Sequence, residues 1–170
     1  MAHNHIPNNE TQVCCKIITV SDTRNWETDK SGSLMKERLL LEGHIVSDYE
    51  IVKDEKEDIT TAVQSGLHNS DIDAVLLNGG TGIAMRDVTI ESIQPLLQKE
   101  LPGFGELFRY LSYTEDIGSS AILSRAIAGI SKGKVIFSVP GSTGAVRLAM
   151  EKLILPELRH ITAELNKDKR

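Results

Sequence analysis

Short apolar runs alternate along this chain with segments whose apolar residues recur at helical spacing, and this alternation constrains the fold most strongly. The run from Ile72 to Leu77 is typical of a strand buried on both faces, as in a parallel sheet. Between two such runs, residues 59–67 place apolar side chains at the spacing of an amphipathic helix. The alternation predicts an α/β fold, a three-layer α/β/α sandwich around a mainly parallel sheet.

The same patterns predict the individual elements. Strands are expected at residues 13–20, 44–52, 72–77, 126–130 and 135–139. Helices are expected at residues 34–41, 59–67, 89–97, 103–113 and 146–154. Pro156 should break or kink the last helix, after which an apolar stripe continues to Leu165. The three-residue link 131–133 favours a hairpin at one sheet edge, and a single domain is expected over residues 13–165, after a flexible tail at residues 1–12.

The composition argues against several classes of function. With 19 Lys and Arg residues against 24 Asp and Glu residues, the net charge is −5, which disfavours a nucleic-acid binder and a basic helix on a membrane surface. No apolar run reaches the length of a membrane span, and the first dozen residues lack the apolar region of a signal peptide. We therefore expect neither nucleic acid nor membrane as a partner.

The two cysteines, Cys14 and Cys15, are adjacent. Neighbouring side chains on a strand point to opposite faces, so a disulfide between them would be strained. We interpret them as core thiols of a protein in the reducing cytoplasm. His3 and His5 could bind a metal, but they fall in the expected tail.

Polar loops follow four of the predicted strands. Ligands of open parallel sheets bind beyond the carboxyl ends of the strands, so these loops should converge on one crevice. In chain order the candidate substrate-binding and catalytic residues are Ser21 and Asp22, then Asp54, then Gly79, Gly80, Thr81, Gly82 and Asp87, and finally Pro140, Gly141, Ser142 and Thr143.

The glycines in the loop at residues 79–82 have a structural explanation. Glycines let the backbone approach a ligand closely and present N–H groups to anionic oxygens. The sequence matches neither the dinucleotide-binding fingerprint G-x-G-x-x-G nor the P-loop pattern. Ser142 and Thr143 could cap a helix or hold a phosphate at its start, and the sequence leaves both roles open.

Asp54 and Asp87 indicate a candidate site only when they are considered as a pair. Alone, Asp87 is typical of a helix N-cap and Asp54 of a solvated helix start. Two carboxylates beside anion-binding loops suit Mg²⁺ held together with substrate phosphates. Glu106 is a third candidate acid, with a solvated helix face as the alternative.

Taken in order, these motifs resemble the MoaB/MogA family of molybdenum cofactor biosynthesis, and the resemblance covers about residues 13–160. Its strongest segments are residues 78–82, 86–91, 101–106, 121–126 and 140–143, together with Ser21, Asp22, Ser31 and Gly32. Residues 108–112 and 140–143 look more like the MoaB branch. One departure is Asn78, where threonine is common in the family.

The resemblance implies a fold, an assembly and an activity. The fold is a three-layer α/β sandwich and the assembly is a trimer or hexamer. The activity is Mg-ATP-dependent adenylylation of molybdopterin, which gives adenylyl-molybdopterin and pyrophosphate. The family's two key acids fall on Asp54 and Asp87, which would position Mg²⁺ and the ATP phosphates, while the glycine loop, Ser142 and Thr143 would cradle the molybdopterin phosphate.

Two alternatives remain open at the level of sequence. One is a molybdopterin-binding carrier or scaffold with the same site and no adenylylation. The other is a receiver-type signalling domain, which is also doubly wound. A receiver domain needs a phospho-accepting aspartate at the end of the third strand, where this chain has Asn78.

Overall fold

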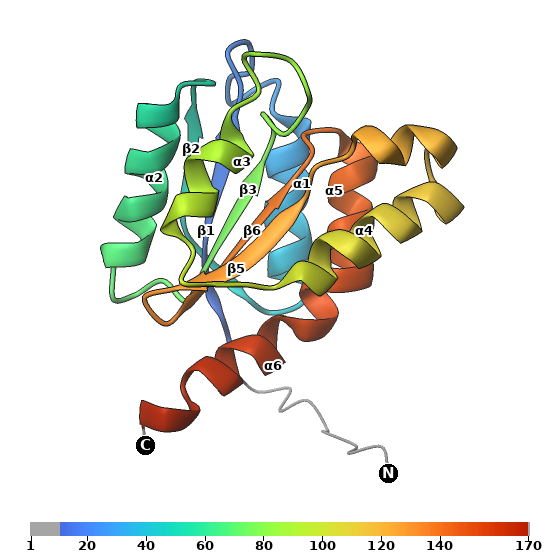
Figure 1. Cartoon of the computed structure of the whole chain (residues 1–170). Helices are drawn as coiled ribbons and strands as arrows, with labels where there is room; N and C mark the ends of the chain where they lie inside the picture. The colour runs from blue at the N-terminus through green and yellow to red at the C-terminus, as the bar shows by residue number, and fades with distance from the viewer. Residues whose placement is uncertain (1–10, 170) are drawn as a thin grey trace.

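A computed structural model describes residues 11–169 and contains one six-stranded sheet in the order β2-β1-β3-β6-β5-β4 (Figure 1). Its parallel part consists of β1 (Cys14–Val20), β2 (Ile45–Val52), β3 (Ala74–Asn78) and β6 (Lys134–Val139). Antiparallel pairing adds β5 (Ile127–Ser131) and β4 (Lys99–Glu100). The carboxyl ends of the four parallel strands therefore meet at one edge of the sheet.

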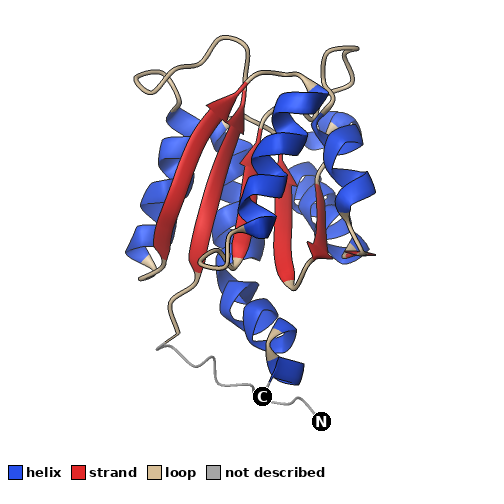
Figure 2. Ribbon diagram, turned by 90° about the vertical axis from the view of Figure 1, so that its left-hand side faces the viewer, coloured by secondary structure: helices blue, strands red, loops and turns tan. Residues whose placement is uncertain are grey.

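Helices cover both faces of the sheet, which confirms the predicted three layers (Figures 1 and 2). One face packs against α1 (Lys30–Leu41), α4 (Pro102–Glu115), α5 (Thr143–Ala149) and α6 (Leu155–Leu165). The other packs against α2 (Lys56–His68) and α3 (Thr89–Ile93). Short helical turns occupy Gln94–Leu96, Gly118–Leu123 and Lys167–Lys169.

Strand β3 lies at the centre of both cores. Ala74 and Leu76 face one helical layer, while Val75 and Leu77 face the other, and all four side chains are fully buried. Burial on both faces explains why this strand is apolar without alternation. It also fixes the position of the polar residues that follow Leu77, because they begin where the buried strand ends.

The predicted hairpin is present between β5 and β6. Lys132 and Gly133 form its turn with φ values of 51° and 72°, and two positive φ values match the right-handed twist of the flanking strands. The two-residue strand β4 pairs with β5 on its outer side, so it forms the extreme edge of the sheet.

The predicted break near Pro156 takes the form of a π-helical turn, Met150–Ile154, that joins α5 to α6. Pro156 lies in the first turn of α6, a position that proline favours. Figure 1 shows that α6 runs in a different direction from α5.

Most of the tail expected at residues 1–12, with His3 and His5, lies outside the described residues. Within them, the Thr11 carbonyl accepts a hydrogen bond from Arg159, and the Gln12 side chain donates one to the Gly43 carbonyl. Cys14 is partly buried and Cys15 is buried, and both are free thiols. No helix in residues 11–169 has the length and apolar character needed to cross a membrane.

Candidate functional site

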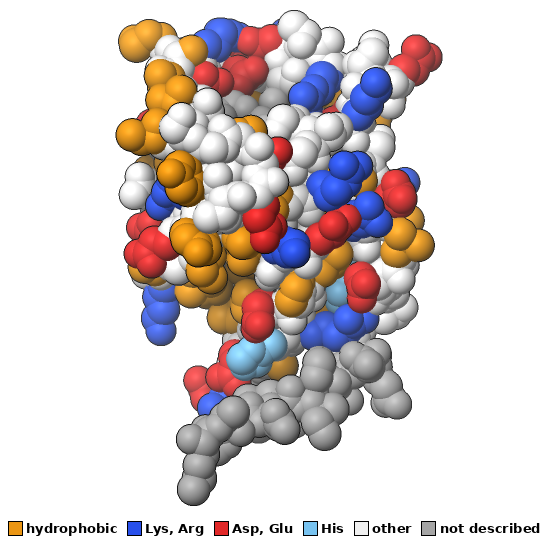
Figure 3. Space-filling view, turned by 90° about the vertical axis from the view of Figure 1, so that its right-hand side faces the viewer, with side chains coloured by type: hydrophobic (Ala, Val, Ile, Leu, Met, Phe, Trp, Pro, Cys, Tyr) orange, Lys and Arg blue, Asp and Glu red, His pale blue; other side chains and the backbone are white. Residues whose placement is uncertain are grey.

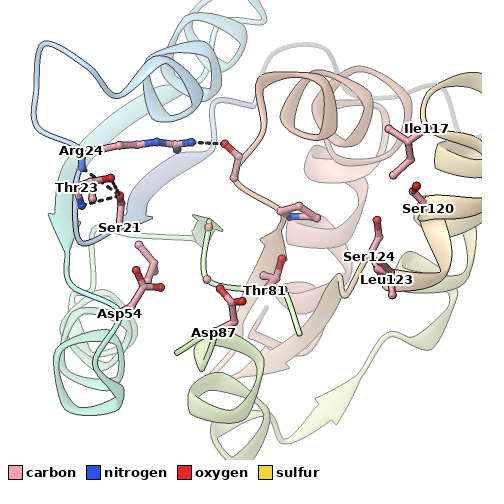
Figure 4. Close-up of a pocket in the computed structure, with 16 residues that line it drawn as sticks. Ser21, Thr23, Arg24, Asp54, Thr81, Asp87, Ile117, Ser120, Leu123 and Ser124 are labelled. Atoms are coloured by element: carbon pink, nitrogen blue, oxygen red, sulfur yellow. Dashed lines mark hydrogen bonds between the residues drawn. The ribbon is translucent and has the colours of Figure 1, made fainter. Parts of the chain in front are cut away.

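A cleft of about 500 Å³ opens at the carboxyl ends of the parallel strands (Figure 4). Four loops and the turn after α4 form its walls. The loop residues that line it are Val20, Ser21, Thr23, Arg24, Asp54, Gly79, Gly80, Thr81, Gly82, Asp87, Pro140 and Gly141. The turn after α4 contributes Ile117, Ser120, Leu123 and Ser124.

The cleft brings together nine of the residues that the sequence indicates: Ser21, Asp54, Gly79, Gly80, Thr81, Gly82, Asp87, Pro140 and Gly141. Four others are not among its lining residues. Asp22 lies in the first loop, Ser142 and Thr143 are exposed at the start of α5, and Glu106 is exposed on α4.

The Asp87 carboxylate is held by the backbone just after the glycine loop and not by the helix that follows Asp87. Helix α3 begins at Thr89 with Val88 as its N-cap, so Asp87 does not cap it. Its Oδ2 atom instead accepts a hydrogen bond of 3.0 Å from the Ala84 backbone. A Cβ atom built on Gly82 would come within 2.6 Å of this oxygen, so the glycine makes room for the carboxylate.

Asp54 lies in an electrostatically unfavourable place for a carboxylate. Burial and the negative charges of Asp22 and Asp87 raise its pKa above the ordinary value. A backbone hydrogen bond from Asp22 offsets only part of this rise. The Asp54 and Asp87 carboxylates both reach into the cleft (Figure 4), where a bound cation would offset their repulsion.

Asp22 holds the rim of the cleft together. Its Oδ1 atom accepts hydrogen bonds from the Asp54 backbone at 3.2 Å and from Arg86 at 3.1 Å. Arg86 also bonds Glu55 Oε1 at 3.0 Å, so one guanidinium links three loops. The hydrogen bond from Arg86 lowers the pKa of Asp22, which keeps this carboxylate ionised.

Two side chains hold the carbonyl groups of the glycine loop. Arg125 donates to the carbonyls of Thr81 at 2.9 Å and Gly82 at 2.7 Å. Buried Thr89 donates from its hydroxyl to the Gly79 carbonyl at 2.9 Å. In the described part of the chain, the N–H groups of Gly80, Thr81 and Gly82 have no hydrogen-bond partner. The Gly79 N–H donates to the Val139 carbonyl at 3.1 Å, so the loop has its carbonyls bound and three of its four donors available to a ligand.

The start of α5 shows the capping role of Ser142 directly. Its Oγ atom accepts a hydrogen bond of 3.1 Å from the Ala145 backbone, and the side chain of Thr143 is exposed. Of the two roles that the sequence leaves open for Ser142, capping is present in the structure.

Arg24 and the wall formed by residues 117–124 were not identified from the sequence. The backbone N–H of Arg24 donates to Ser21 Oγ at 3.1 Å, so a serine-anchored turn brings its side chain over the cleft. That turn is a local signal that the Ser21 motif contained. Residues 121–126 contribute to the family resemblance, but no local pattern placed the wall at the cleft, because it follows a helix in sequence and reaches the cleft only through tertiary packing.

A metal held by protein ligands alone has no site among residues 11–169, where no cluster of three or more His, Cys, Asp or Glu side chains could hold one. The pair Asp54 and Asp87 fits a cation that takes its other ligands from substrate phosphates and water. Mg²⁺ is commonly bound in this way.

Residues 16–160 match the family described as "Probable molybdopterin binding domain". The chain belongs to this family. The family expected from the sequence is thereby confirmed, and the match covers all four loops of the cleft and the wall at residues 117–124. All residues that line the cleft therefore lie within the matched region of the chain.

Individual members of the molybdopterin-binding family are closely similar to this chain. Molybdenum cofactor biosynthesis protein B of Bacillus anthracis is 65% identical over 156 residues, which is 92% of each protein. A crystal structure of a molybdenum cofactor biosynthesis protein B superposes with a TM-score of 0.91 at 65% identity and covers 92% of this chain and 98% of that one. The tungsten cofactor synthesizing protein MoaB from Pyrococcus furiosus gives 0.81 at 42% identity, covering 91% and 97%.

Proposed function

We propose that this protein binds molybdopterin in the cleft and adenylylates it with Mg-ATP, as a cytoplasmic step of molybdenum cofactor biosynthesis. The observation that carries the proposal is the pair Asp54 and Asp87 beside a glycine loop in which the backbone donors of Gly80, Thr81 and Gly82 are free. Relatives named for molybdenum cofactor biosynthesis, at up to 65% identity, support the same pathway.

In this proposal the two carboxylates bind the cation and the glycine loop binds phosphate. Asp54 and Asp87 would hold Mg²⁺, which supplies neutralisation of phosphate charge when bound. The free N–H groups of Gly80, Thr81 and Gly82 bind phosphate oxygens, as backbone donors do in other anion sites. Ser142 and Thr143 directly follow Gly141 at the start of α5 and do not line the cleft, and we propose that they extend the phosphate cradle beyond it.

The chemistry needs positioning more than proton transfer. The terminal phosphate of molybdopterin attacks the α-phosphorus of ATP and forms a new P–O bond, while the bond to the β-phosphate oxygen breaks and pyrophosphate leaves. A phosphate is already anionic near neutral pH, so no strong general base is required. The residues of the cleft hold the two phosphates together and reduce their repulsion.

We also propose that the chain associates with copies of itself as a trimer or hexamer. Exposed hydrophobic side chains gather on the face that contains α4 (Figure 3). Tyr110 is 64% exposed, Tyr113 60% and Ile122 85%. An apolar surface of this kind is typical of a protein interface.

Turnover tests the proposed activity directly. Purified protein is incubated with molybdopterin, ATP and Mg²⁺, and pyrophosphate and adenylylated product are measured. We expect product with the wild-type protein, a large loss with Asp87→Asn, and little change with Asp71→Asn, which alters an exposed aspartate at the opposite end of β3. Bound molybdopterin without product would establish a carrier instead, and equal losses in both variants would remove Asp87 from the mechanism.

A further inference from the structure

Arg24 is the single cationic side chain among the described residues that line the cleft. The other charged groups there are the carboxylates of Asp54 and Asp87. Arg24 extends from the first loop across the top of the cleft, away from Asp87 (Figure 4). A ligand with several phosphate oxygens would therefore meet acidic groups on one side and a guanidinium on the other.

The guanidinium of Arg24 is held in place by three groups. It donates to Ser31 Oγ at 3.2 Å and to the Gly141 carbonyl at 2.8 Å. Its Nη1 atom also lies 3.8 Å from Oδ1 of Asp29, which is 1% exposed. These contacts fix the orientation of the side chain before any ligand arrives, which lowers the entropy lost on binding.

The carboxylate of Asp29 is itself fully engaged. Its Oδ1 accepts from the Gly32 backbone at 3.0 Å, and its Oδ2 accepts from Thr19 at 2.6 Å and from the Tyr49 hydroxyl. Asp29 is therefore anchored by the core, and its separation of 3.8 Å from Arg24 leaves the guanidinium without a close bidentate partner.

Arg24 retains hydrogen-bonding capacity. A guanidinium has five N–H donors, and the bonds to Ser31 and Gly141 use one on each terminal nitrogen. The side chain is 31% exposed, so its remaining donors are accessible from the cleft. The planar fork of arginine matches the geometry of phosphate oxygens better than a lysine ammonium does.

We propose that Arg24 is a ligand-binding residue that contacts a phosphate oxygen of the substrate. The inference rests on the proposed function for the location of the site, and it adds a specific cationic contact. Arg24 then compensates the negative charge that Asp54 and Asp87 alone would place against a polyphosphate. A role only as a clamp between the first loop and the loop at Gly141 is the competing explanation.

Binding of inorganic pyrophosphate in the presence of Mg²⁺, measured by titration calorimetry, tests the proposal without requiring turnover. We expect Arg24→Gln to lower the affinity about tenfold to a hundredfold, the range of a charge-assisted hydrogen bond. Arg24→Lys should give an intermediate loss, because it keeps the charge and loses the fork. Arg147→Gln makes the same charge change on an exposed residue of α5 outside the cleft and should bind like the wild type.

The dependence of affinity on salt separates a ligand contact from a clamp. If Arg24 contacts the anion, the affinity of the wild type falls more steeply with ionic strength than that of Arg24→Gln. The proposal is overturned if the wild type binds no pyrophosphate, if Arg24→Gln binds it as tightly as the wild type, or if the two salt dependences coincide. Pyrophosphate binding that depends on Arg24, without any adenylylated product, would contradict the proposed activity alone.

Discussion

The carboxylate of Asp54 lies directly against the backbone of Gly80. A Cβ atom built on Gly80 would come within 2.8 Å of Asp54 Oδ1 and within 2.2 Å of Thr89 Oγ1. Gly80 also has a φ of +65°, in the left-handed region that glycine adopts without strain. The position of the carboxylate in the cleft thus depends on the absence of a side chain at residue 80.

Gly80→Ala should therefore damage both stability and the site. We expect the free energy of unfolding to fall by about 1–3 kcal/mol, because a non-glycine residue in this conformation is strained and the new methyl group collides with Asp54 and Thr89. Denaturant unfolding measures this effect. Gly103→Ala is the matched control, since Gly103 lies in α4 and a Cβ atom added there would meet nothing within 4 Å, and it should be neutral or slightly stabilising.

Asp54→Asn should raise the melting temperature at neutral pH while lowering turnover. The raised pKa of Asp54 means that the folded protein binds this proton more tightly than the unfolded chain, so the ionised form destabilises the fold. The stability difference between variant and wild type should shrink as the pH falls through that raised pKa. Melting curves over a pH series check the sign, and a constant difference would contradict it.

Magnesium provides a second comparison for the same variant. Adding Mg²⁺ should raise the melting temperature of the wild type more than that of Asp54→Asn, because the cation offsets the repulsion from Asp22 and Asp87 only where both site carboxylates remain. Equal stabilisation of both proteins would show that Asp54 does not take part in cation binding.

Arg86→Gln should reduce turnover with little effect on the melting temperature. Exposed ion pairs contribute little to global stability, yet Arg86 joins Asp22 and Glu55 to the loop that contains Asp87. Misplacement of Asp87 should lower turnover about tenfold. Steady-state kinetics beside a thermal melt separate the two effects, and Arg86→Lys should recover part of the activity.

The two adjacent thiols should react at different rates. Burial raises the pKa of the Cys15 thiol, so its reactive thiolate form is suppressed, whereas Cys14 is only partly buried. We expect a thiol reagent to modify one cysteine of the native protein. Cys14→Ser should abolish this reaction and Cys15→Ser should preserve it, as mass spectrometry of the labelled protein would reveal.

Tyr110→Lys should weaken self-association without unfolding the chain. Tyr110 is exposed on α4, so a charged residue costs little in the monomer and is unfavourable at an apolar interface. Sedimentation velocity compares the variant with Lys36→Ala, which alters an exposed residue of α1. A Tyr110→Lys protein that sediments like the wild type would place the interface elsewhere.

Features with a local physical cause could be predicted from the sequence. Burial on both faces gives β3 its apolar run, and its end places residues 79–82 at the sheet edge. Strand β4 could not be predicted, because its two residues are exposed and define no period. The position of the wall at Ile117 and Leu123 could not be predicted either, because tertiary packing brings these residues to the cleft.

Candidate site residues differ in the same way. Asp54 and Asp87 could be predicted as site residues because one comes after a strand end and the other after a glycine loop. The exposure of Glu106 could not be predicted, because it depends on the rotation of α4 against the core. The residue type of Arg24 did not indicate a role in the site, because an arginine in a polar loop is ordinarily solvated. Its position depends on nearby Asp29 and on Gly141, which is 117 positions away in sequence.

The bond from Arg24 to Gly141 joins residues that are 117 positions apart. It can form only after β6 has paired with β3 and β3 with β1, since these pairings bring the two loops to one edge. Loop closure over so long a separation is entropically costly and belongs to the late stages of folding. A nascent chain released before β6 emerges would therefore lack the cleft, and affinity for a phosphate ligand would report completion of the fold.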